Sequence, residues 1–316
     1  MNTGKYTRLE IFAKALQAGG SVRVISNDGE CQEIPAGQAS YKWIQIPVEK
    51  NTEYEIFCEE CQVSICYLSG CENILDEGVC YLEQDENGRF IRMRESDWYD
   101  SPIREAYHFT PWKNWINDPN GLCWFQGYYH MFYQFNPHSQ KWSHMYWGHA
   151  ASRDLIHWTH LPVALEPQEE ILKYPEELDG GAFSGSAVVM GDEVVFYLTR
   201  SREPRGKVEQ ILQQQWRMKS SDMLHFTKEE LVIGERPAGA SPDFRDPKVM
   251  RADGRWQMVL GSALEGKAAI LKYESEDMES WEYTGPLLTE EEDGIRCVEC
   301  PDFMELDGKY LVIGAL

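Results

Sequence analysis

The chain has 316 residues with 30 Lys and Arg against 52 Asp and Glu, so its formal net charge is 30 minus 52, or −22. That acidity argues against general affinity for nucleic acid or an anionic membrane and favours a neutral partner. The length fits one large all-β domain with a small extra module, or two to three ordinary domains. With no bilayer-length apolar run and no uninterrupted secretory segment, the default expectation is a cytoplasmic protein.

The first part of the chain predicts a small, mainly β module. Residues 5–20 (KYTRLEIFAKALQAGG) indicate a short helix ended by Gly19 and Gly20. From Ser21 to about Tyr81, short apolar alternations separated by turn-like NDG and PAG segments predict strands: SVRVIS, YKWIQIPV, YEIFC and VSICYL. Two interpretations stay open, a sandwich packed against the rest of the chain and a carbohydrate-binding appendage.

Six of the nine cysteines fall in this module: Cys31, Cys58, Cys61, Cys66, Cys71 and Cys80. Closely spaced thiolates can complete a tetrahedral zinc site. However, the segment YEIFCEECQVSICYL alternates like a strand, and buried free cysteines pack as small hydrophobes. Because the paired spacing of a zinc ribbon is also incomplete, we expect no metal site. Disulfides would require an oxidising compartment, of which the sequence gives no other sign.

Two polar stretches follow, EQDENGRF (83–90) and ESDWYDSP (95–102). They are expected to form a linker, since Pro102 disfavours regular structure across it. The sequence therefore predicts a module with its linker over residues 1–100 and a second domain over residues 101–316.

The second domain repeats one hairpin pattern four times, in which two apolar strands flank a tight turn. The copies are GLCWFQGYYHMFYQ (121–134), GSAVVMGDEVVFYL (185–198), KVMRADGRWQMVL (248–260) and DFMELDGKYLVIG (302–314). Their turn glycines, which supply positive φ, are 64, 63 and 54 residues apart: Gly127, Gly191, Gly254 and Gly308.

A second phrase follows each of the first three hairpins: SRDLIHW (152–158), SSDMLHF (220–226) and SEDMESW (275–281). Each copy is expected to turn the chain into an outer strand. Four-stranded units recurring at this period predict an all-β propeller, whose innermost strands line a central channel.

Three acidic residues stand at the entrances of these inner strands: Asp118 in WINDPNG, Asp246 in FRDPKV and Glu299 in VECPD. Although 128 and 53 residues separate them, radial symmetry would gather them at one mouth. Such a set suits cleavage of a glycosidic bond, where one carboxylate acts as nucleophile or base and another donates a proton. The alternative, an Asp that only caps a turn, is preferred for Asp253 and Asp307 in the DG turns.

From about Arg104 to Leu316 the chain closely resembles glycoside hydrolase family 32, which contains invertases, sucrose-6-phosphate hydrolases, inulinases and levanases. Six motifs occur in the family's order: WINDPNG, YHMFYQFNP, WGHAASRDLIHW, FSGSAV, FRDPKV and ECPD. The resemblance implies a five-bladed β-propeller followed by a β-sandwich. It also implies a retaining double displacement, without a cofactor, on β-fructofuranosides such as sucrose, sucrose phosphate or short fructans.

By the same resemblance, Asp118 would be the nucleophile, Glu299 the acid and base, and Asp246 the stabiliser of the transition state. Trp142 is the least regular match, since relatives often have Gly directly after this Trp where this chain has Ser143. The residues that the resemblance assigns to the fructose pocket are Asn117, Gln134, Trp142, Phe183, Ser184 and Arg245.

The chemistry also sets a requirement on the two catalytic acids, because the nucleophile must be ionised while the acid is protonated. Val298 and Pro301 give Glu299 an apolar setting that would favour its protonated form. Asparagine donors beside Asp118 would favour its charged form.

The sequence ends at Leu316, after the fourth hairpin. About four blades are therefore expected, without the C-terminal sandwich, and a partner or a missing C-terminal segment would complete the propeller. Two other functions stay open: an inverting furanosidase acting on arabinose-containing glycans, and a non-catalytic carbohydrate-binding or truncated protein. Arg202, Arg205 and Lys207 are candidates for contact with a substrate phosphate, although a solvated loop is the preferred interpretation.

Overall fold

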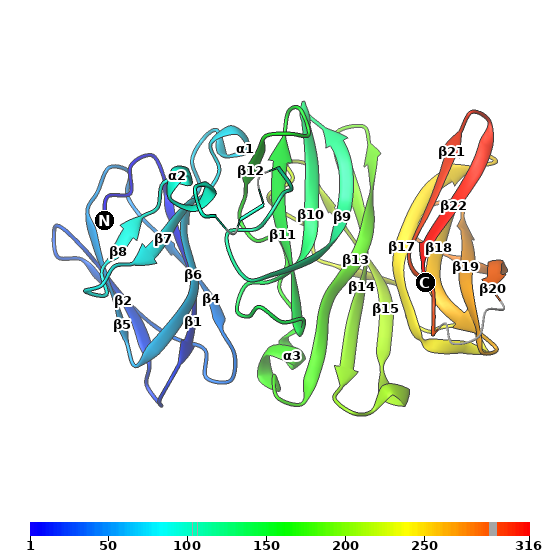
Figure 1. Cartoon of the computed structure of the whole chain (residues 1–316), viewed down its shortest axis with the longest axis horizontal. Coiled ribbons are helices and arrows are strands. Elements are labelled where there is room, and N and C mark those ends of the chain that lie inside the picture. Colours follow the sequence, from blue (N-terminus) through cyan, green and yellow to red (C-terminus); the bar gives the residue numbers. More distant parts are fainter. Residues whose placement is uncertain (103, 106, 291–295) are drawn as a thin grey trace.

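The computed structural model describes residues 1–102, 104–105, 107–290 and 296–316. It confirms the all-β class: strands from successive parts of the chain form a row of sheets, with the N-terminal strands at one end and the C-terminal hairpin at the other (Figure 1). Within the described part of the chain, no helix is long and apolar enough to cross a membrane.

The N-terminal strands form two sheets. The five-stranded sheet has the order β4 (Lys42–Pro47), β1 (Arg8–Ala15), β6 (Cys61–Ser69), β7 (Cys80–Gln84) and β8 (Phe90–Arg92). The three-stranded sheet has the order β3 (Cys31–Pro35), β2 (Ser21–Ser26) and β5 (Tyr54–Glu59). Two short helices, α1 (Ile74–Glu77) and α2 (Glu95–Tyr99), lie in the connections. Apolar side chains from both sheets share one buried cluster, which makes this region a small sandwich.

The helix expected near the N-terminus is wrong, because these residues form the strand β1 between β4 and β6. Both faces of β1 are covered: Leu9 and Ile11 pack into the sandwich, while Phe12 packs toward the next sheet in the chain. Burial on two faces outweighs local helix propensity here.

Part of the expected linker is also wrong. Residues 83–90 belong to the β7–β8 hairpin, whose turn is closed by the Asp85 side chain accepting from the backbone of Asn87 and Arg89. By contrast, the alternations YEIFC and VSICYL, predicted as strands, lie in β5 and β6. These two strands belong to different sheets, and Glu60 between them has φ of 47°. The domain boundary near residue 100 stays a prediction.

Three four-stranded units follow. Blade 1 contains β9 (Trp115–Phe125), β10 (Tyr128–Asn136), β11 (His144–Ser152) and β12 (Trp158–His160). Blade 2 contains β13 (Leu178–Met190), β14 (Glu193–Pro204), β15 (Leu212–Ser220) and β16 (Glu230–Ile233). Blade 3 contains β17 (Ala240–Ala252), β18 (Arg255–Leu264), β19 (Lys267–Ser275) and β20 (Glu282–Glu290). A last hairpin pairs β21 (Glu299–Leu306) with β22 (Lys309–Ala315).

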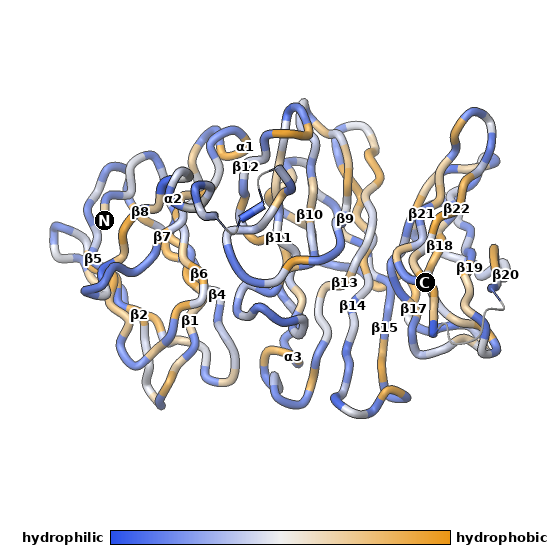
Figure 2. Tube along the Cα trace, in the orientation of Figure 1, coloured by the Kyte–Doolittle hydropathy of each residue, from blue (hydrophilic) through white to orange (hydrophobic). Residues whose placement is uncertain are grey.

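The blades are antiparallel throughout, and a short parallel pairing of β11 with β13 joins the first two. The connections also hold α3 (Glu169–Lys173) and a 3₁₀ turn (Val208–Gln210). Separate buried clusters fill the space between the sandwich and blade 1, between blades 1 and 2, and between blades 2 and 3. In Figure 2 hydrophobic residues accordingly concentrate along the strands and hydrophilic ones along many of the connections.

Both repeated sequence patterns are confirmed. The four glycine turns join β9 to β10, β13 to β14, β17 to β18 and β21 to β22. The second phrase follows the third strand of each blade. In its first copy, Ser152 Oγ accepts from the backbone of Leu155, while Asp154 accepts from Ile156 and His157. The other two copies repeat these bonds, and Leu155, Met223 and Met278 all have positive φ.

The inner strands share a feature that the sequence did not reveal: each has a β-bulge near or before its middle. At each bulge two residues of the inner strand oppose one residue of its partner. The bulged pairs are Asn117 and Asp118 in β9, Phe183 and Ser184 in β13, Asp246 and Pro247 in β17, and Cys300 and Pro301 in β21. Bulges bend a strand and re-aim its side chains, so polar groups from four inner strands can point toward one place.

Candidate active site

A cavity of about 420 Å³ lies where the bulged ends of the inner strands meet. The structure brings all nine residues named from the sequence into its wall. The lining residues are Asn117, Asp118, Gln134, Trp142, Phe183, Ser184, Glu203, Asp243, Arg245, Asp246, Arg296 and Glu299. Their catalytic and binding roles stay predictions, but their convergence is an observed property of the fold.

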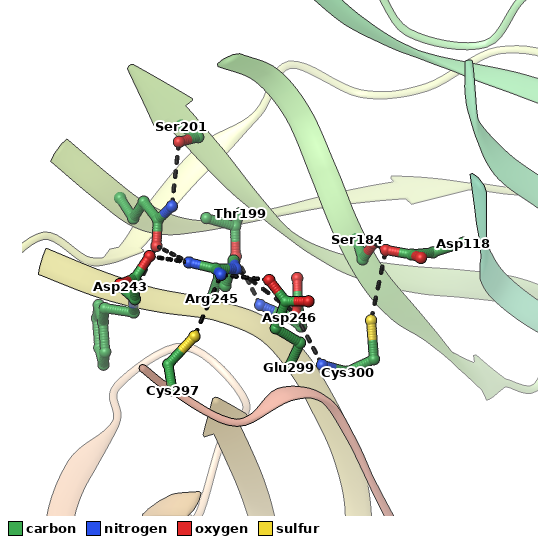
Figure 3. A network of polar contacts seen from close by, with 12 residues as sticks. Asp118, Ser184, Thr199, Ser201, Asp243, Arg245, Asp246, Cys297, Glu299 and Cys300 are labelled. Atoms are coloured by element: carbon green, nitrogen blue, oxygen red, sulfur yellow. Dashed lines mark hydrogen bonds and ion pairs between the residues drawn. The ribbon is translucent and has the colours of Figure 1, made fainter. Parts of the chain in front are cut away.

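Asp118 lies in the β9 bulge and is held by two neighbours through one oxygen. Its Oδ2 accepts from Ser184 Oγ at 2.7 Å and from Cys300 Sγ at 3.4 Å. Ser184 belongs to blade 2 and Cys300 to the last hairpin, so this carboxylate is oriented from both sides. Figure 3 shows Ser184 and Cys300 both next to the Asp118 carboxylate.

Asp246 is the most buried of the three acids, with 6% of its surface exposed. Its backbone has φ of 64°, an unusual value for a non-glycine residue, and its N–H donates to Thr199 Oγ1 at 3.0 Å. Its Oδ2 accepts from the backbone N–H of Cys300 at 2.8 Å. Such backbone strain persists only where the surroundings enforce it, and it concentrates at functional sites.

The burial of Asp246 has an electrostatic consequence. Burial raises the pKa of Asp246 to about 6, although the Arg245 guanidinium and the Cys300 amide act in the opposite direction. The charges of Asp118 and Glu299 add to the increase. Asp246 can therefore change its protonation state near neutral pH.

Arg245 connects the acids of blade 3 and the last hairpin. Its Nη1 donates to Asp243 Oδ1 at 2.5 Å, and its Nη2 donates to Glu299 Oε1 at 2.5 Å and to Cys297 Sγ at 3.3 Å. Asp243 is shared with Arg296, which donates to both of its oxygens at 2.7 and 2.9 Å. Figure 3 shows Arg245 at the centre of this network.

The apolar setting expected around Glu299 is wrong. The Val298 side chain is buried in a cluster with Val259 and Ile270, away from the carboxylate. The Glu299 side chain is 55% exposed and forms an ion pair with Arg245. Neighbours in sequence alternate between the two faces of a strand, so an apolar residue beside an acid need not surround it.

The remaining lining residues named from the sequence include both polar and aromatic side chains. Gln134 is almost fully buried and donates from Nε2 to the Ala182 carbonyl at 2.8 Å. Asn117 accepts a hydrogen bond from Trp115 Nε1 at 2.6 Å. Trp142 is 39% exposed and meets Phe183 edge to face, with ring centroids 5.9 Å apart. The cavity wall thus combines a flat aromatic surface with hydrogen-bonding groups, a combination that suits the apolar face and the hydroxyls of a sugar ring.

Three residues of the wall were missed by sequence reasoning: Glu203, Asp243 and Arg296. Asp243 lies two residues before Arg245 on β17, so strand alternation around this named residue could have found it. Glu203 lies two residues after Ser201 on β14, and Ser201 was not among the residues named from the sequence. Burial raises the pKa of Glu203, although the Ser201 hydroxyl, which donates to it at 2.9 Å, partly offsets this. No motif marks Arg296.

The basic residues considered for phosphate binding lie elsewhere. Arg202 pairs with Glu170 at 2.9 Å, and Arg205 pairs with Asp179 at 2.8 Å. None of the three candidates lines the cavity. All nine cysteines are free thiols, and the residues that the structure describes contain no group of three or more His, Cys, Asp or Glu arranged to hold a metal.

A β-propeller whose inner strands gather carboxylates at one end is the class of protein that this fold and cavity define. Within that class the profile of the glycosyl hydrolases family 32 N-terminal domain matches residues 108–315. The chain therefore belongs to glycoside hydrolase family 32, which confirms the resemblance seen in its motifs.

Curated relatives agree with this assignment. The chain is 35% identical over 233 residues to a sucrose-6-phosphate hydrolase from Zymomonas mobilis. The matched region covers 70% of this chain and 43% of that protein. It is 35% identical over 221 residues to a levanase from Bacillus subtilis, covering 67% and 30%. The chain thus spans less than half the length of these relatives.

Solved structures show how far the likeness extends. A family 32 structure from Bifidobacterium adolescentis covers 100% of this chain and 61% of its own, with a TM-score of 0.91 and 30% identity. The Bombyx mori β-fructofuranosidase BmSUC1 covers 67% of this chain and 43% of its own, with a TM-score of 0.59 and 36% identity. The first likeness includes the N-terminal sandwich.

Proposed function

We propose that this chain carries the catalytic site of a retaining β-fructofuranosidase, which releases fructose from a fructoside by double displacement. The supporting observation is the cavity itself, in which Asp118 and Glu299 face one space from different inner strands. A double displacement needs two such carboxyl groups beside one glycosidic bond.

In the first step, Asp118 attacks the anomeric carbon of the fructosyl unit. Because Ser184 and Cys300 both contact Oδ2, we assign the attack to Oδ1. A bond forms between this oxygen and the sugar while the bond to the leaving oxygen breaks. Glu299 transfers its proton to the leaving oxygen. Arg245 holds Oε1, so we assign this transfer to Oε2.

In the second step, Glu299 removes a proton from water, and the water oxygen displaces Asp118 from the sugar. Fructose leaves, and both carboxyl groups return to their starting states. Asp246, when ionised, accepts hydrogen bonds from fructose hydroxyls that strengthen as positive charge develops on the ring.

The charges of the cavity favour an uncharged substrate. Its wall holds the five carboxyl groups of Asp118, Glu203, Asp243, Asp246 and Glu299 and the two guanidinium groups of Arg245 and Arg296. With all five acids ionised its formal charge is two minus five, or −3, and it stays negative when Glu299 carries the proton that it donates. Both guanidinium groups are already paired with carboxylates. A phosphate ester would be repelled here, so we propose unphosphorylated sucrose or short fructans as substrates. The cytoplasmic location stays a prediction.

The test compares kcat/KM of the full chain for sucrose, for sucrose 6-phosphate and for a short fructan. We expect at least about tenfold lower kcat/KM for the phosphate ester at low ionic strength, and a smaller difference in high salt, because salt screens the repulsion. A preference for the phosphate ester would contradict the proposed substrate while leaving the proposed reaction intact.

The catalytic assignment is tested with Asp118→Ala and Glu299→Ala. We expect each variant to lower kcat by at least about a hundredfold, because each removes a group that takes part in bond making or proton transfer. The control is Asp253→Ala, which changes an acid in the β17–β18 turn. Equal fructose release by all variants would favour the non-catalytic alternative.

A further inference from the structure

The N-terminal sandwich contacts blade 1 at a loop that also contributes a residue to the cavity wall. Residues 137–143 join β10 to β11 and carry Trp142 into the cavity wall; we call them the Trp142 loop. His138 of this loop lies against the sandwich. Its Nδ1 is 2.7 Å from Ser64 Oγ of β6, and the Tyr41 ring stacks on its ring with centroids 4.2 Å apart.

On its other side His138 is held by blade 1, where its Nε2 is 3.0 Å from the Tyr146 hydroxyl. Burial, aided by His144 and Lys14, lowers the pKa of His138 to about 3. The ring is therefore neutral at ordinary pH. One ring nitrogen then donates and the other accepts, and hydroxyl groups can satisfy both.

Hydrogen bonds within the loop link His138 to the residue before Trp142. The backbone N–H of His138 donates to Asn136 Oδ1 at 3.1 Å, and Asn136 Nδ2 donates to the Lys141 carbonyl at 2.8 Å. Lys141 directly precedes Trp142. Asn114 Nδ2 adds a bond of 2.7 Å to the Pro137 carbonyl, which ties the start of the loop to the residue before β9.

We propose that the N-terminal sandwich is a positioning element of the fructoside pocket: Ser64 and Tyr41 hold His138, and His138 fixes the loop that sets Trp142 against the sugar. This inference rests on the proposed function of the cavity. Neither Ser64 nor Tyr41 lines the cavity, so they are positioning residues and not catalytic ones. The wall that Trp142 forms contacts the sugar before and during reaction, so loosening it affects binding more than turnover.

The test is a double-mutant cycle between Ser64→Ala and Trp142→Ala in the full chain, with fructose release from sucrose as the assay. Losing one neutral hydrogen bond corresponds to about a twofold to tenfold effect. We expect Ser64→Ala to raise KM by about this factor and to leave kcat within about twofold. In the Trp142→Ala background the same change should have no further effect on KM, because the residue through which it acts is gone.

The matched control is Ser21→Ala, which removes a comparable bond, from Ser21 Oγ to Glu33 Oε1 at 2.8 Å, elsewhere in the sandwich. It should leave KM unchanged. Tyr41→Leu, which removes the stacked ring but keeps an apolar side chain, should reproduce the effect of Ser64→Ala. An unchanged KM in Ser64→Ala, or an equal change with and without Trp142, would overturn the inference.

A second readout separates this inference from the proposed function. Calorimetric titration with fructose measures occupancy of the cavity without turnover. If the unaltered chain releases no fructose from any fructoside, but Ser64→Ala weakens fructose binding only when Trp142 is present, the proposed reaction fails and the positioning role stands. If fructose binding is indifferent to Ser64 while the unaltered chain is active, the positioning role alone fails.

Discussion

Asp246 combines a strained backbone with a buried carboxyl group, and both follow from its place in the β17 bulge. The bulge turns its side chain inward, where the Cys300 N–H and Arg245 lie within reach. Water is largely excluded from this position. The positive φ and the buried carboxyl group of Asp246 both cost free energy of folding. We attribute the retention of this unfavourable arrangement to the contact that Asp246 makes with the sugar ring.

The raised pKa of Asp246 predicts opposite effects of pH on stability and on activity. Because its pKa is about 6 in the folded chain against an ordinary 3.8, the folded state binds the proton more tightly. Its contribution to the free energy of unfolding is therefore complete below about pH 4 and is lost as the pH rises through about 6. The ionised form is the one that accepts bonds from fructose, so kcat/KM should rise over the same interval.

The check is a pair of pH profiles, one of kcat/KM and one of the free energy of unfolding. In Asp246→Asn, the activity should be low at every pH, and the loss of stability between about pH 4 and 6 should be smaller than in the unaltered chain. Identical stability profiles for the two proteins would show that Asp246 does not titrate in this range.

Residue identities in the cavity could be predicted where a motif marks them. Asn117, Asp118 and Ser184 lie in short segments of unusual composition, and these segments converge. Arg296 could not be found in this way, because its significance is an ion pair with Asp243, which joins the residues before β21 to β17. Such pairing depends on which strands become neighbours, which no local pattern records.

At the scale of the elements, the hairpin repeat was readable because glycine turns and apolar flanks recur in the sequence. The bulges were not, since the four bulged pairs share no composition: they are Asn117 and Asp118, Phe183 and Ser184, Asp246 and Pro247, and Cys300 and Pro301. Strand β1 was mistaken for a helix for a related reason: its residues face two different cores, so the period of two that identifies a half-buried strand is absent.

Gly261 tests the packing that places β21 beside blade 3. A Cβ added at Gly261 would lie 2.2 Å from the Val298 carbonyl oxygen, so Gly261→Ala must push the strand that carries Glu299 outward. We expect the free energy of unfolding to fall by about 1 to 3 kcal/mol, as in other overpacked cores, together with a lower kcat.

Chemical denaturation and steady-state kinetics measure these two effects. The matched control is Gly234→Ala, where the nearest atom to an added Cβ is a Leu231 side-chain carbon at 3.4 Å. Gly234→Ala should leave both quantities nearly unchanged. A Gly261→Ala protein with the stability and kcat of this control would show that β21 does not depend on close approach to β18.

At the scale of the whole molecule, the sandwich and blade 1 share one core. Phe12 of β1 stacks on Trp43 with centroids 5.3 Å apart and meets Tyr146 of β11 edge to face at 6.0 Å. Glu10, fully buried on the same strand, accepts from Trp43, Tyr67 and Ser69, and Tyr67 in turn accepts from the Val163 backbone beyond blade 1. This continuity argues that the two regions unfold together.

Phe12→Ala is the change that tests this coupling. Removing a buried Phe costs about 3 to 5 kcal/mol, and the loss should be felt on both sides of the shared core. Hydrogen exchange followed by mass spectrometry should show faster exchange in peptides from β1 and from β10 and β11. Met258→Ala, in the core of blade 3, should leave these peptides unaffected. Faster exchange confined to β1 after Phe12→Ala would mean that the two regions open independently.

Beyond blade 3, the last hairpin exposes apolar side chains: Leu306, Tyr310, Leu311 and Ile313. The expectation that a further segment or a partner completes the propeller stays a prediction. The residues to which we assign the chemistry all line the cavity of this chain, so the proposed reaction can be tested with the chain itself.

The stereochemistry of the released sugar tests the central claim most directly. Rapid NMR of sucrose hydrolysed by the full chain should detect β-fructofuranose as the first product, before it equilibrates with its other forms, because two displacements at one carbon preserve its configuration. Initial formation of the α-anomer would show that Asp118 does not form a covalent intermediate and would contradict the account.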